Sequence, residues 1–386
     1  MAAEADVWLA RFAKLVVALT FLLIFIGGHT TTAGAGMAFP DWPLSHGSVN
    51  PNGWWNDMMM RLEHGHRWTA GPTGLLIGAL CAWVWRSKWA VPVALGVGVF
   101  AGGFVKAAGG ATVAVALVGI ASSATTFAVM LLGSARRDPA PRAAAIRWVA
   151  LAAFLGVCAQ AVLGGLRVVL DPQGVAATTA ATATTFRIIH GCFAQLELCF
   201  VVALAAMLSP VWRGLPLRPE LRSVARLGWV ASGCVALQLI IGATMRHLGA
   251  GLAIPTWPQA TPDGGWLPVV HNAFVDLNFT HTRIGAIVVS GLIVAFAFRA
   301  IGLAGSEAKF VRPAVLLLAL IAAQVALGLF VVWNGRPAML TTLHVVNGAA
   351  VLATTLLLTL RAGRASRREH RSGAPLPIRQ LWEVAV

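Results

Sequence analysis

Long apolar segments alternate with polar connections along the whole chain. We count ten of them, at about residues 12–33, 65–86, 89–106, 111–134, 147–168, 184–208, 227–247, 279–299, 313–333 and 341–361. Most reach the ~20 residues that an α-helix needs to cross the hydrocarbon core of a bilayer. The pattern therefore predicts an all-α polytopic membrane protein with about ten transmembrane helices.

The amino-acid composition supports this prediction. Hydrophobic residues make up 58% of the 386 residues and charged residues only 11%, whereas a soluble domain carries about 25% charged residues. The formal charge of +15 fits the cytoplasmic loops of a membrane protein better than a nucleic-acid surface. We expect membrane lipid, and no nucleic acid, to contact most of this surface.

Basic residues collect in the connections on one side of the predicted membrane. They are Arg86, Lys88, Arg136, Arg137, Arg142, Arg147, Arg213, Arg218, Arg222, Arg226, Arg299, Lys309, Arg312, Arg361, Arg364, Arg367, Arg368 and Arg371. The positive-inside rule makes this side cytoplasmic and puts both termini there. The opposite side carries two long loops rich in Trp and Pro, at 34–64 and 248–278.

All five cysteines lie inside apolar segments, and no CxxC pair occurs; they are Cys81, Cys158, Cys192, Cys199 and Cys234. Cysteines in this setting are typical of helix packing. The sequence therefore predicts neither a disulfide framework nor a zinc site.

The two long loops contain an internal repeat. The stretch 26–43 recurs at 241–258, with matching glycine, proline and tryptophan residues at a constant offset of 215 residues. A second stretch that begins at Gln160 recurs at Gln324, at an offset of 164. The difference, 215 − 164 = 51, is close to the length of the apolar hairpin 89–134, which we interpret as an insertion in the first half.

This repeat predicts two pseudo-symmetric parallel four-helix bundles plus the inserted transmembrane hairpin. An even number of helices per unit makes the units parallel, which argues against the inverted repeats of many transporters. We predict an N-terminal unit at 1–208, a cytoplasmic linker at 209–226, a C-terminal unit at 227–362 and a cytoplasmic tail at 363–386.

Four of the ten histidines share one position in the predicted topology. His66, His190, His281 and His344 each lie in the first turns of a helix that is entered from the outer side. Two imidazoles on neighbouring helices of a bundle can ligate one heme iron from both faces. We therefore predict two heme sites near the outer face, each held by one histidine pair. His64 is the rival of His66 as a ligand, and the repeat offset favours His66.

Arginines flank both histidine pairs. Arg67 and Arg187 accompany the first pair, and Arg246, Arg283 and Arg336 accompany the second. Guanidinium groups at this depth suit the carboxylates of heme propionates, which accept paired hydrogen bonds. The alternative is that these side chains only reach out to the membrane interface.

Glu63 distinguishes the first half from the second. It precedes His66 by three residues, about one helical turn, so its carboxylate can approach the same heme face. The equivalent position before His281 is Asn278. We infer a reactive site in the first half and a structural or electron-transfer heme in the second. The alternative is that Glu63 only caps its helix or pairs with Arg67.

Glu197 is the one acid deep in an apolar segment. It follows His190 by seven residues and so lies on the same face of the helix. A proton relay and a plain hydrogen bond within the bundle are both open for this side chain.

These residues resemble the heme A synthase family of cytochrome oxidase assembly. The resemblance covers nearly the whole chain, apart from the hairpin 89–134 and the residues after about 362. It depends on Gly27-Gly28 through Pro40-Asp41-Trp42-Pro43, on Glu63-x-x-His66-Arg67, on Gln160-x-x-Leu163-Gly164-Gly165-Leu166, and on the order of His190, His281 and His344.

The resemblance implies an oxidoreductase of the cytoplasmic (inner) membrane that oxidises a ring methyl of heme O to the formyl group of heme A. It implies that His66 and His190 hold the substrate heme O, with Glu63 near the methyl that reacts. It also implies that His281 and His344 hold a heme b cofactor. Heme O synthase and cytochrome oxidase assembly factors are the implied protein partners, and a homo-oligomer is left open.

Three features depart from the family pattern. Neither outer loop contains the cysteine pair that many members carry there. The second half reads His281-Thr282-Arg283 in place of a His-Arg pair, and the hairpin 89–134 is an addition.

Three other functions stay open on the sequence. A di-heme membrane cytochrome, which moves electrons between quinone and another carrier, would explain the four histidines but not the difference between Glu63 and Asn278. A non-enzymatic heme carrier would keep the histidines and need no acid. A solute transporter leaves the four-histidine pattern unexplained.

Overall fold

The computed structural model describes residues 2–135, 144–170 and 177–367. This part of the chain is mostly helical and contains no β-strand, which confirms the predicted all-α class. Some predicted features lie outside the described residues: the basic residues Arg136, Arg137, Arg142, Arg368 and Arg371, and most of the predicted tail at 363–386.

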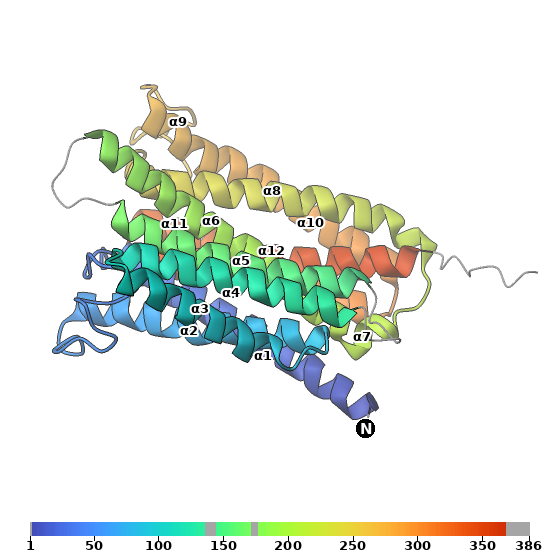
Figure 1. The fold of residues 1–386 in the computed structure, drawn as a ribbon. Helices are drawn as coiled ribbons and strands as arrows, with labels where there is room; N and C mark the ends of the chain where they lie inside the picture. Colours follow the sequence, from blue (N-terminus) through green and yellow to red (C-terminus); the bar gives the residue numbers. More distant parts are fainter. Residues whose placement is uncertain (1, 136–143, 171–176, 368–386) are drawn as a thin grey trace, which may run out of the picture.

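Ten long helices and a few short helical turns make up the described part of the chain (Figure 1). They are α1 (Ala2–Thr32), α2 (Met58–Val84), α3 (Ala90–Ala107), α4 (Thr112–Ala135), α5 (Ala144–Val169), α6 (Ala177–Leu208), α7 (Pro210–Arg213), η1 (Pro219–Leu221), α8 (Arg222–His247), η2 (Ala250–Leu252), α9 (Ala273–Phe279), η3 (Thr280–Gly285), α10 (Ala286–Ala304), α11 (Ala308–Trp333) and α12 (Ala338–Ser366). The pieces α9, η3 and α10 form one continuous helix.

Nine helices in the described ranges are long and apolar enough to cross a membrane, in agreement with the predicted polytopic class. The tenth long helix, α2, has 27 residues, but its first turns carry Arg61, Glu63, His64, His66 and Arg67. Polar side chains at such a place are costly in a membrane protein and usually serve a function. The beginning of α2 is therefore a candidate functional site.

The helices form two packed groups. α1, α2, α5 and α6 enclose a hydrophobic core that includes Leu80 and Leu198, and we refer to them as the first bundle. α8, α10, α11 and α12 enclose a core that includes Phe296 and Leu317, and they are the second bundle. The bundles meet where α1 packs on α12 and where α6 packs on α8 and α12.

The helices α3 and α4 form a hairpin at the edge of the first bundle, over the segment where the sequence predicts an insertion. They pack closely on each other, so that a Cβ added to Gly98 would lie 2.7 Å from the carbonyl oxygen of Gly119. The hairpin contacts α2 and α5, while Phe100 and Phe104 are 79% and 71% exposed. Such an exposed apolar surface suits contact with lipid.

The loops 33–57 and 248–272 lie at the same end of the molecule, at the left in Figure 1. We refer to this as the loop end. The beginning of α1 and the end of α12 lie at the opposite end. The helices that carry the four candidate histidines begin at the loop end, so these histidines lie in the part of the bundles nearest to the two loops. The bonds Trp42–Pro43 and Trp257–Pro258 in these loops are both cis.

Candidate functional site

Two of the candidate histidines lie against a glycine of the preceding long helix. In the first bundle, His66 on α2 packs on Gly27 of α1, where an added Cβ would lie 2.7 Å from His66 Cε1. In the second bundle, His281 packs on Gly242 of α8, where the corresponding distance is 2.5 Å. Both distances are far shorter than carbon–carbon van der Waals contact, so a glycine is needed to leave room for each ring.

The other two histidines repeat this arrangement. His190 on α6 packs on Gly164 of α5, and His344 on α12 packs on Gly328 of α11. A Cβ added to either glycine would lie 3.1 Å from Cε1 of the histidine. All four predicted ligands therefore occupy the same kind of place, with the imidazole laid over a glycine of a neighbouring helix in the same bundle.

The histidines of the second bundle have a spacing that suits two ligands of one metal. The ring centres of His281 and His344 lie 6.4 Å apart, and the ring planes make an angle of 78°. Two imidazoles bound to one metal from opposite faces, through bonds of ~2 Å, place their ring centres roughly 6 Å apart. The Nδ1 atoms of both rings are buried and have no hydrogen-bond partner among the described residues. The pair therefore fits the two axial ligands of a heme iron.

The histidines of the first bundle have similar surroundings. Nδ1 of His66 and Nδ1 of His190 are also buried, with no hydrogen-bond partner in the described ranges. The two rings are close enough to interact electrostatically. Gln160 donates a hydrogen bond of 2.9 Å to the backbone oxygen of His190, as Gln238 in the second bundle does to that of His281 at 2.8 Å.

The donor set favours heme over a bare metal ion. No group of three or more His, Cys, Asp or Glu side chains that could hold a metal ion occurs in the part of the chain that the structure describes. Each bundle instead offers two imidazoles with buried Nδ1 atoms, which suits a group that supplies the other four ligands itself. One contact must change on binding: Nε2 of His344 lies 3.2 Å from the amide nitrogen of Gln324, and a nitrogen that ligates iron cannot keep it.

His64 on α2 contacts the loop that precedes this helix and does not follow this pattern. Its Nδ1 lies 3.0 Å from Oγ of Ser45. Its ring packs against Phe39, Trp54 and Trp68. These contacts account for the burial of His64 and leave His66 as the candidate ligand in this turn of α2.

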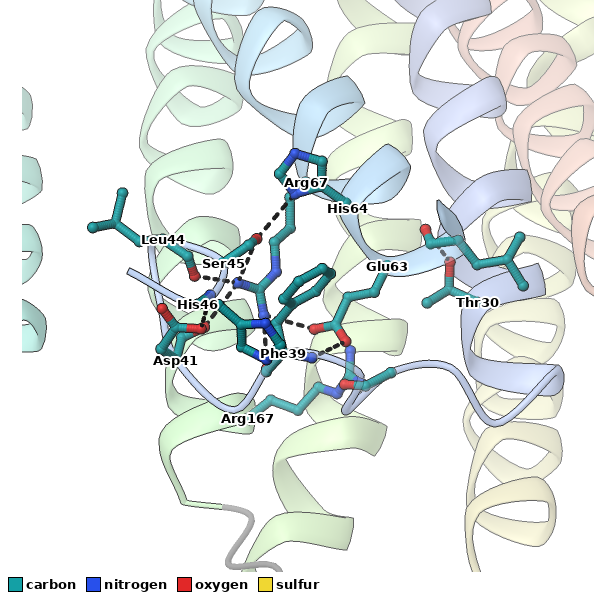
Figure 2. A network of polar contacts seen from close by, with 12 residues as sticks. Thr30, Phe39, Asp41, Leu44, Ser45, His46, Glu63, His64, Arg67 and Arg167 are labelled. Atoms are coloured by element: carbon teal, nitrogen blue, oxygen red, sulfur yellow. Dashed lines mark hydrogen bonds and ion pairs between the residues drawn. The ribbon is translucent and has the colours of Figure 1, made fainter. Parts of the chain in front are cut away.

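Glu63 and Arg67 clamp the same loop onto α2 (Figure 2). Arg67 donates to Oε1 of Glu63 at 2.6 Å, and the backbone N–H of Phe39 donates to Oε2 at 3.0 Å. Arg67 also donates to the carbonyl oxygens of Asp41 and Leu44, at 2.8 and 2.6 Å. Glu63 therefore pairs with Arg67, which is the alternative role that the sequence left open for it. Its buried carboxylate holds the loop in place.

The second bundle has a matching clamp around Arg283. This side chain donates to the carbonyl oxygens of Thr256 and Gln259, at 2.6 and 2.8 Å. These two residues follow Asp41 and Leu44 by the repeat offset of 215. Where the first clamp has the carboxylate of Glu63, the second has the amide of Asn278, whose Oδ1 accepts from Arg283 at 3.3 Å.

A π-helical turn explains the irregular spacing of His281 and Arg283. The turn η3 covers Thr280–Gly285, and a π-helical turn takes up one more residue than an α-helical turn. Thr282 is therefore accommodated as an extra residue, and Arg283 reaches the loop carbonyls as Arg67 does in α2. The departure from the family's His-Arg spacing leaves the clamp intact.

Deletion of Thr282 is expected to turn η3 into a regular α-helical turn, with little loss of folded protein or of bound heme. Deletion of Ala286 is the control, because it removes a residue from the α-helical part and rotates the following residues by ~100° about the helix axis. Heme content and thermal unfolding of the two purified variants check this. Equal damage from both deletions would contradict the prediction.

The remaining predicted arginines lie at the loop end in different roles. Arg246 donates to the carbonyl oxygen of Gly28 at 2.9 Å and to Thr32 Oγ1, so it connects α8 with α1 of the other bundle. Arg336 lies against Gly251, with an added Cβ 2.9 Å from its Cδ. Arg187 precedes His190 by three residues on α6.

Arg167 is a site residue that the sequence reasoning missed. It donates to the carbonyl oxygen of Gly36 at 2.6 Å and lies against that glycine as Arg336 lies against Gly251. Gly36 and Gly251 are related by the offset of 215, but the offset of 164 relates Arg167 to Val331. The repeat therefore gives Arg167 no basic counterpart in the second half. The one signal in the sequence is its position directly after the Gly164-Gly165-Leu166 run. Arg167 is also close enough to His66 and His190 to interact with both electrostatically.

Gly242→Val is expected to displace His281 and to lower the heme content of the second bundle more than tenfold, because the new methyl groups occupy the space of the imidazole. Gly233→Val on the same helix is the matched control, since a Cβ there has no heavy atom within 4 Å. Absorption spectra and heme extraction of both purified variants measure the difference. Full heme content in Gly242→Val would show that the glycine contact is dispensable.

The fold and the site define a class: polytopic membrane proteins in which each of two helical bundles holds a pair of histidines suited to heme. The sequence profile of the family described as cytochrome oxidase assembly protein matches residues 56–356. The chain belongs to this family, and the resemblance stated from its motifs is confirmed.

Several curated relatives carry the name heme A synthase. The one from Azorhizobium caulinodans is 30% identical over 240 residues, which cover 58% of this chain and 64% of that protein. The one from Erythrobacter litoralis is 25% identical over 382 residues, or 94% of this chain and 99% of that protein. The one from Sphingopyxis alaskensis is 30% identical over 155 residues, 37% of this chain and 42% of that protein. The first and third matches thus span less than two thirds of the relative, whereas the second spans almost all of both chains.

Proposed function

We propose that this protein is a heme A synthase, which oxidises a ring methyl of heme O to the formyl group of heme A for the assembly of cytochrome oxidase. The observation that carries the proposal is the fourfold arrangement of histidine over glycine in two bundles, found in a chain of the cytochrome oxidase assembly protein family. The name heme A synthase, which several relatives carry, supports this function.

The two histidine pairs have different roles in this proposal. His66 and His190 hold the substrate heme O in the first bundle, and His281 and His344 hold heme b in the second. The bundle assignment follows from the clamps, because only the first has a carboxylate, Glu63, one turn from its ligand. When bound, heme b supplies one-electron redox chemistry.

The remaining residues position the substrate and stabilise charge. Arg167, Arg246 and Arg336 lie at the loop end and suit the propionate carboxylates. Arg67 and Arg283 were also candidates for this contact, but both terminal nitrogens of each guanidinium group already donate within the two clamps. Glu63 accepts a proton or stabilises positive charge that develops on the carbon being oxidised.

The location follows from the same assignment. The loop end faces the outside of the cytoplasmic membrane, and the basic connections face the cytoplasm. The heme sites then lie near the outer face, where heme O synthase and assembly factors of cytochrome oxidase are the proposed partners.

Extraction of the bound hemes tests the proposed function. The protein is purified from cells that also make heme O, its hemes are extracted with acid, and they are resolved by chromatography. We expect heme b together with heme O, its hydroxylated intermediate or heme A. Heme b alone would contradict the proposal and favour a di-heme cytochrome.

A further inference from the structure

Glu197 is a buried acid of the first bundle that the proposed function does not use. It lies in the middle part of α6 and is 3% exposed. Neither carboxyl oxygen has a hydrogen-bond partner among the described residues. Burial of a carboxyl group without a partner is costly, so a ligand that forms a hydrogen bond with Glu197 would lower this cost.

Glu197 repeats the placement of His190 two turns deeper in the bundle. Seven residues separate the two side chains on α6, which puts them on one face and ~10 Å apart along the helix. His190 lies over Gly164 of α5, and Glu197 lies over Gly156 of the same helix, where an added Cβ would overlap Oε2. The glycine at 156 therefore makes room for the carboxyl group at this depth.

The second bundle has apolar side chains at the two corresponding positions. Val351 follows His344 by seven residues, as Glu197 follows His190, and it is a buried core residue. Leu320 precedes Gly328 by eight residues, as Gly156 precedes Gly164, and it packs on the same core. One bundle thus has an acid over a glycine where the other has two apolar side chains.

A heme whose propionates face the loop end would bring its apolar edge to this depth. The propionates are carboxylates, and the basic side chains that suit them, Arg167 and Arg246, lie at the loop end. The opposite edge of the macrocycle would then point deeper into the bundle. Glu197, ~10 Å along the helix from His190, would lie beyond the ring itself, beside the substituents of that edge. Heme O differs from heme b by a hydroxyethylfarnesyl group in place of a vinyl group, and this group carries a hydroxyl.

We propose that Glu197 selects the substrate heme, by accepting a hydrogen bond from the hydroxyl group of the hydroxyethylfarnesyl substituent. The proposal depends on the proposed function, because it names how the first bundle recognises heme O. A carboxyl oxygen accepts from a hydroxyl group in either protonation state. A site built to bind a hydroxyl rejects the analogue that lacks it, so heme b is disfavoured in the first bundle, while Val351 leaves the second bundle suited to heme b.

The test compares variants of the full-length protein, each purified from cells that make both hemes. The readout is the ratio of hemes with the farnesyl group (heme O, its hydroxylated form and heme A) to heme b after acid extraction. In Glu197→Leu the first bundle is expected to take up heme b, so that the ratio falls about tenfold or more. In Glu197→Gln the ratio is expected to stay near that of the unaltered protein, because the amide oxygen still accepts the hydrogen bond.

Gln195→Leu is the matched control, since it also removes a buried polar side chain from α6, on another face of the helix. Its heme ratio is expected to be unchanged. If Glu197→Leu leaves the first bundle without heme, titration of the purified protein with heme O and with heme b gives the same comparison: Glu197→Gln should bind heme O about tenfold more tightly than Glu197→Leu.

Other outcomes overturn the proposal in distinguishable ways. An unchanged heme ratio in Glu197→Leu, in a background where the unaltered protein makes heme A, rejects substrate selection and leaves the proposed function in place. A proton relay predicts that Glu197→Gln and Glu197→Leu lose heme A equally while both keep the heme ratio. An unaltered protein that holds no farnesylated heme and makes no heme A rejects both proposals together.

Discussion

His281→Ala is expected to remove heme b from the second bundle and to leave the heme of the first bundle in place. An axial ligand contributes more than the outer contacts of a metal site, whose loss alone costs about 10–100-fold in metal affinity. The heme b content should therefore fall more than tenfold. Its partner His344 lies at the distance expected for a second ligand of the same iron, and cannot hold the heme alone. Reduced-minus-oxidised spectra and quantified heme extraction measure the loss.

His66→Ala is the converse change, because it should remove the farnesylated hemes and leave heme b. His64→Ala is its matched control, since His64 lies two residues away and contacts Ser45 and three aromatic rings rather than Gly27. It should keep both hemes. Loss of the same heme from His66→Ala and from His281→Ala would contradict the assignment of one heme to each bundle.

The sequence predicted the helices well because each is marked by its own apolar run. The predicted span 184–208 lies within α6, and the predicted span 147–168 lies within α5. Among the long helices that the structure describes, only α2 is less apolar than a typical span, and its polar beginning is the candidate site. The signal is local, so no knowledge of packing was needed to read it.

The placement of the histidines was predicted from repetition, and the glycines beneath them were not. Gly27 and Gly242 stood in the matching stretches of the repeat, but their contact with His66 and His281 depends on how neighbouring helices pack. Spacing along one helix says which face a residue occupies. It does not say which residue of another helix lies opposite.

The partners of the arginines were beyond the sequence for a similar reason. Arg67 and Arg283 bind backbone carbonyl oxygens of loops, and every residue of a loop offers such an oxygen. The clamp therefore cannot be predicted from the residue types of the loop. The π-helical turn at Thr280–Gly285 hid the equivalence of the two arginines, because it shifts the repeat by one residue between His281 and Arg283.

The two halves therefore share one scaffold and differ at two depths. At the loop end the first bundle has Glu63 where the second has Asn278, and deeper it has Glu197 where the second has Val351. Both differences add an acid to the first bundle. Under the proposed function, these two acids would give reactivity and substrate selection to the first bundle only.

Glu63→Gln is expected to stall the oxidation of heme O while both hemes stay bound. The amide oxygen keeps one of the two acceptors that serve the N–H of Phe39 and Arg67, and Arg67 also keeps its bonds to the loop carbonyls of Asp41 and Leu44. The loop therefore stays on α2, but the negative charge beside the reacting carbon is lost. Removal of one preorganised electrostatic group costs about 10²–10³-fold in rate. Heme A output should fall by that factor, measured by chromatography of extracted hemes against the content of heme O and heme b.

Glutamine is a cleaner test than alanine at this position. Both changes remove the buried ion pair with Arg67, whose loss costs about 3–5 kcal/mol. Alanine removes both acceptor atoms as well, whereas the glutamine oxygen can still accept from Arg67, as Asn278 accepts from Arg283 in the second bundle. Asn278→Asp is the matched control in the second bundle, where an added carboxylate beside Arg283 should leave heme A output unchanged. Normal heme A output from Glu63→Gln would leave Glu63 with the loop clamp alone, and the reactive role of the first bundle would then need another residue.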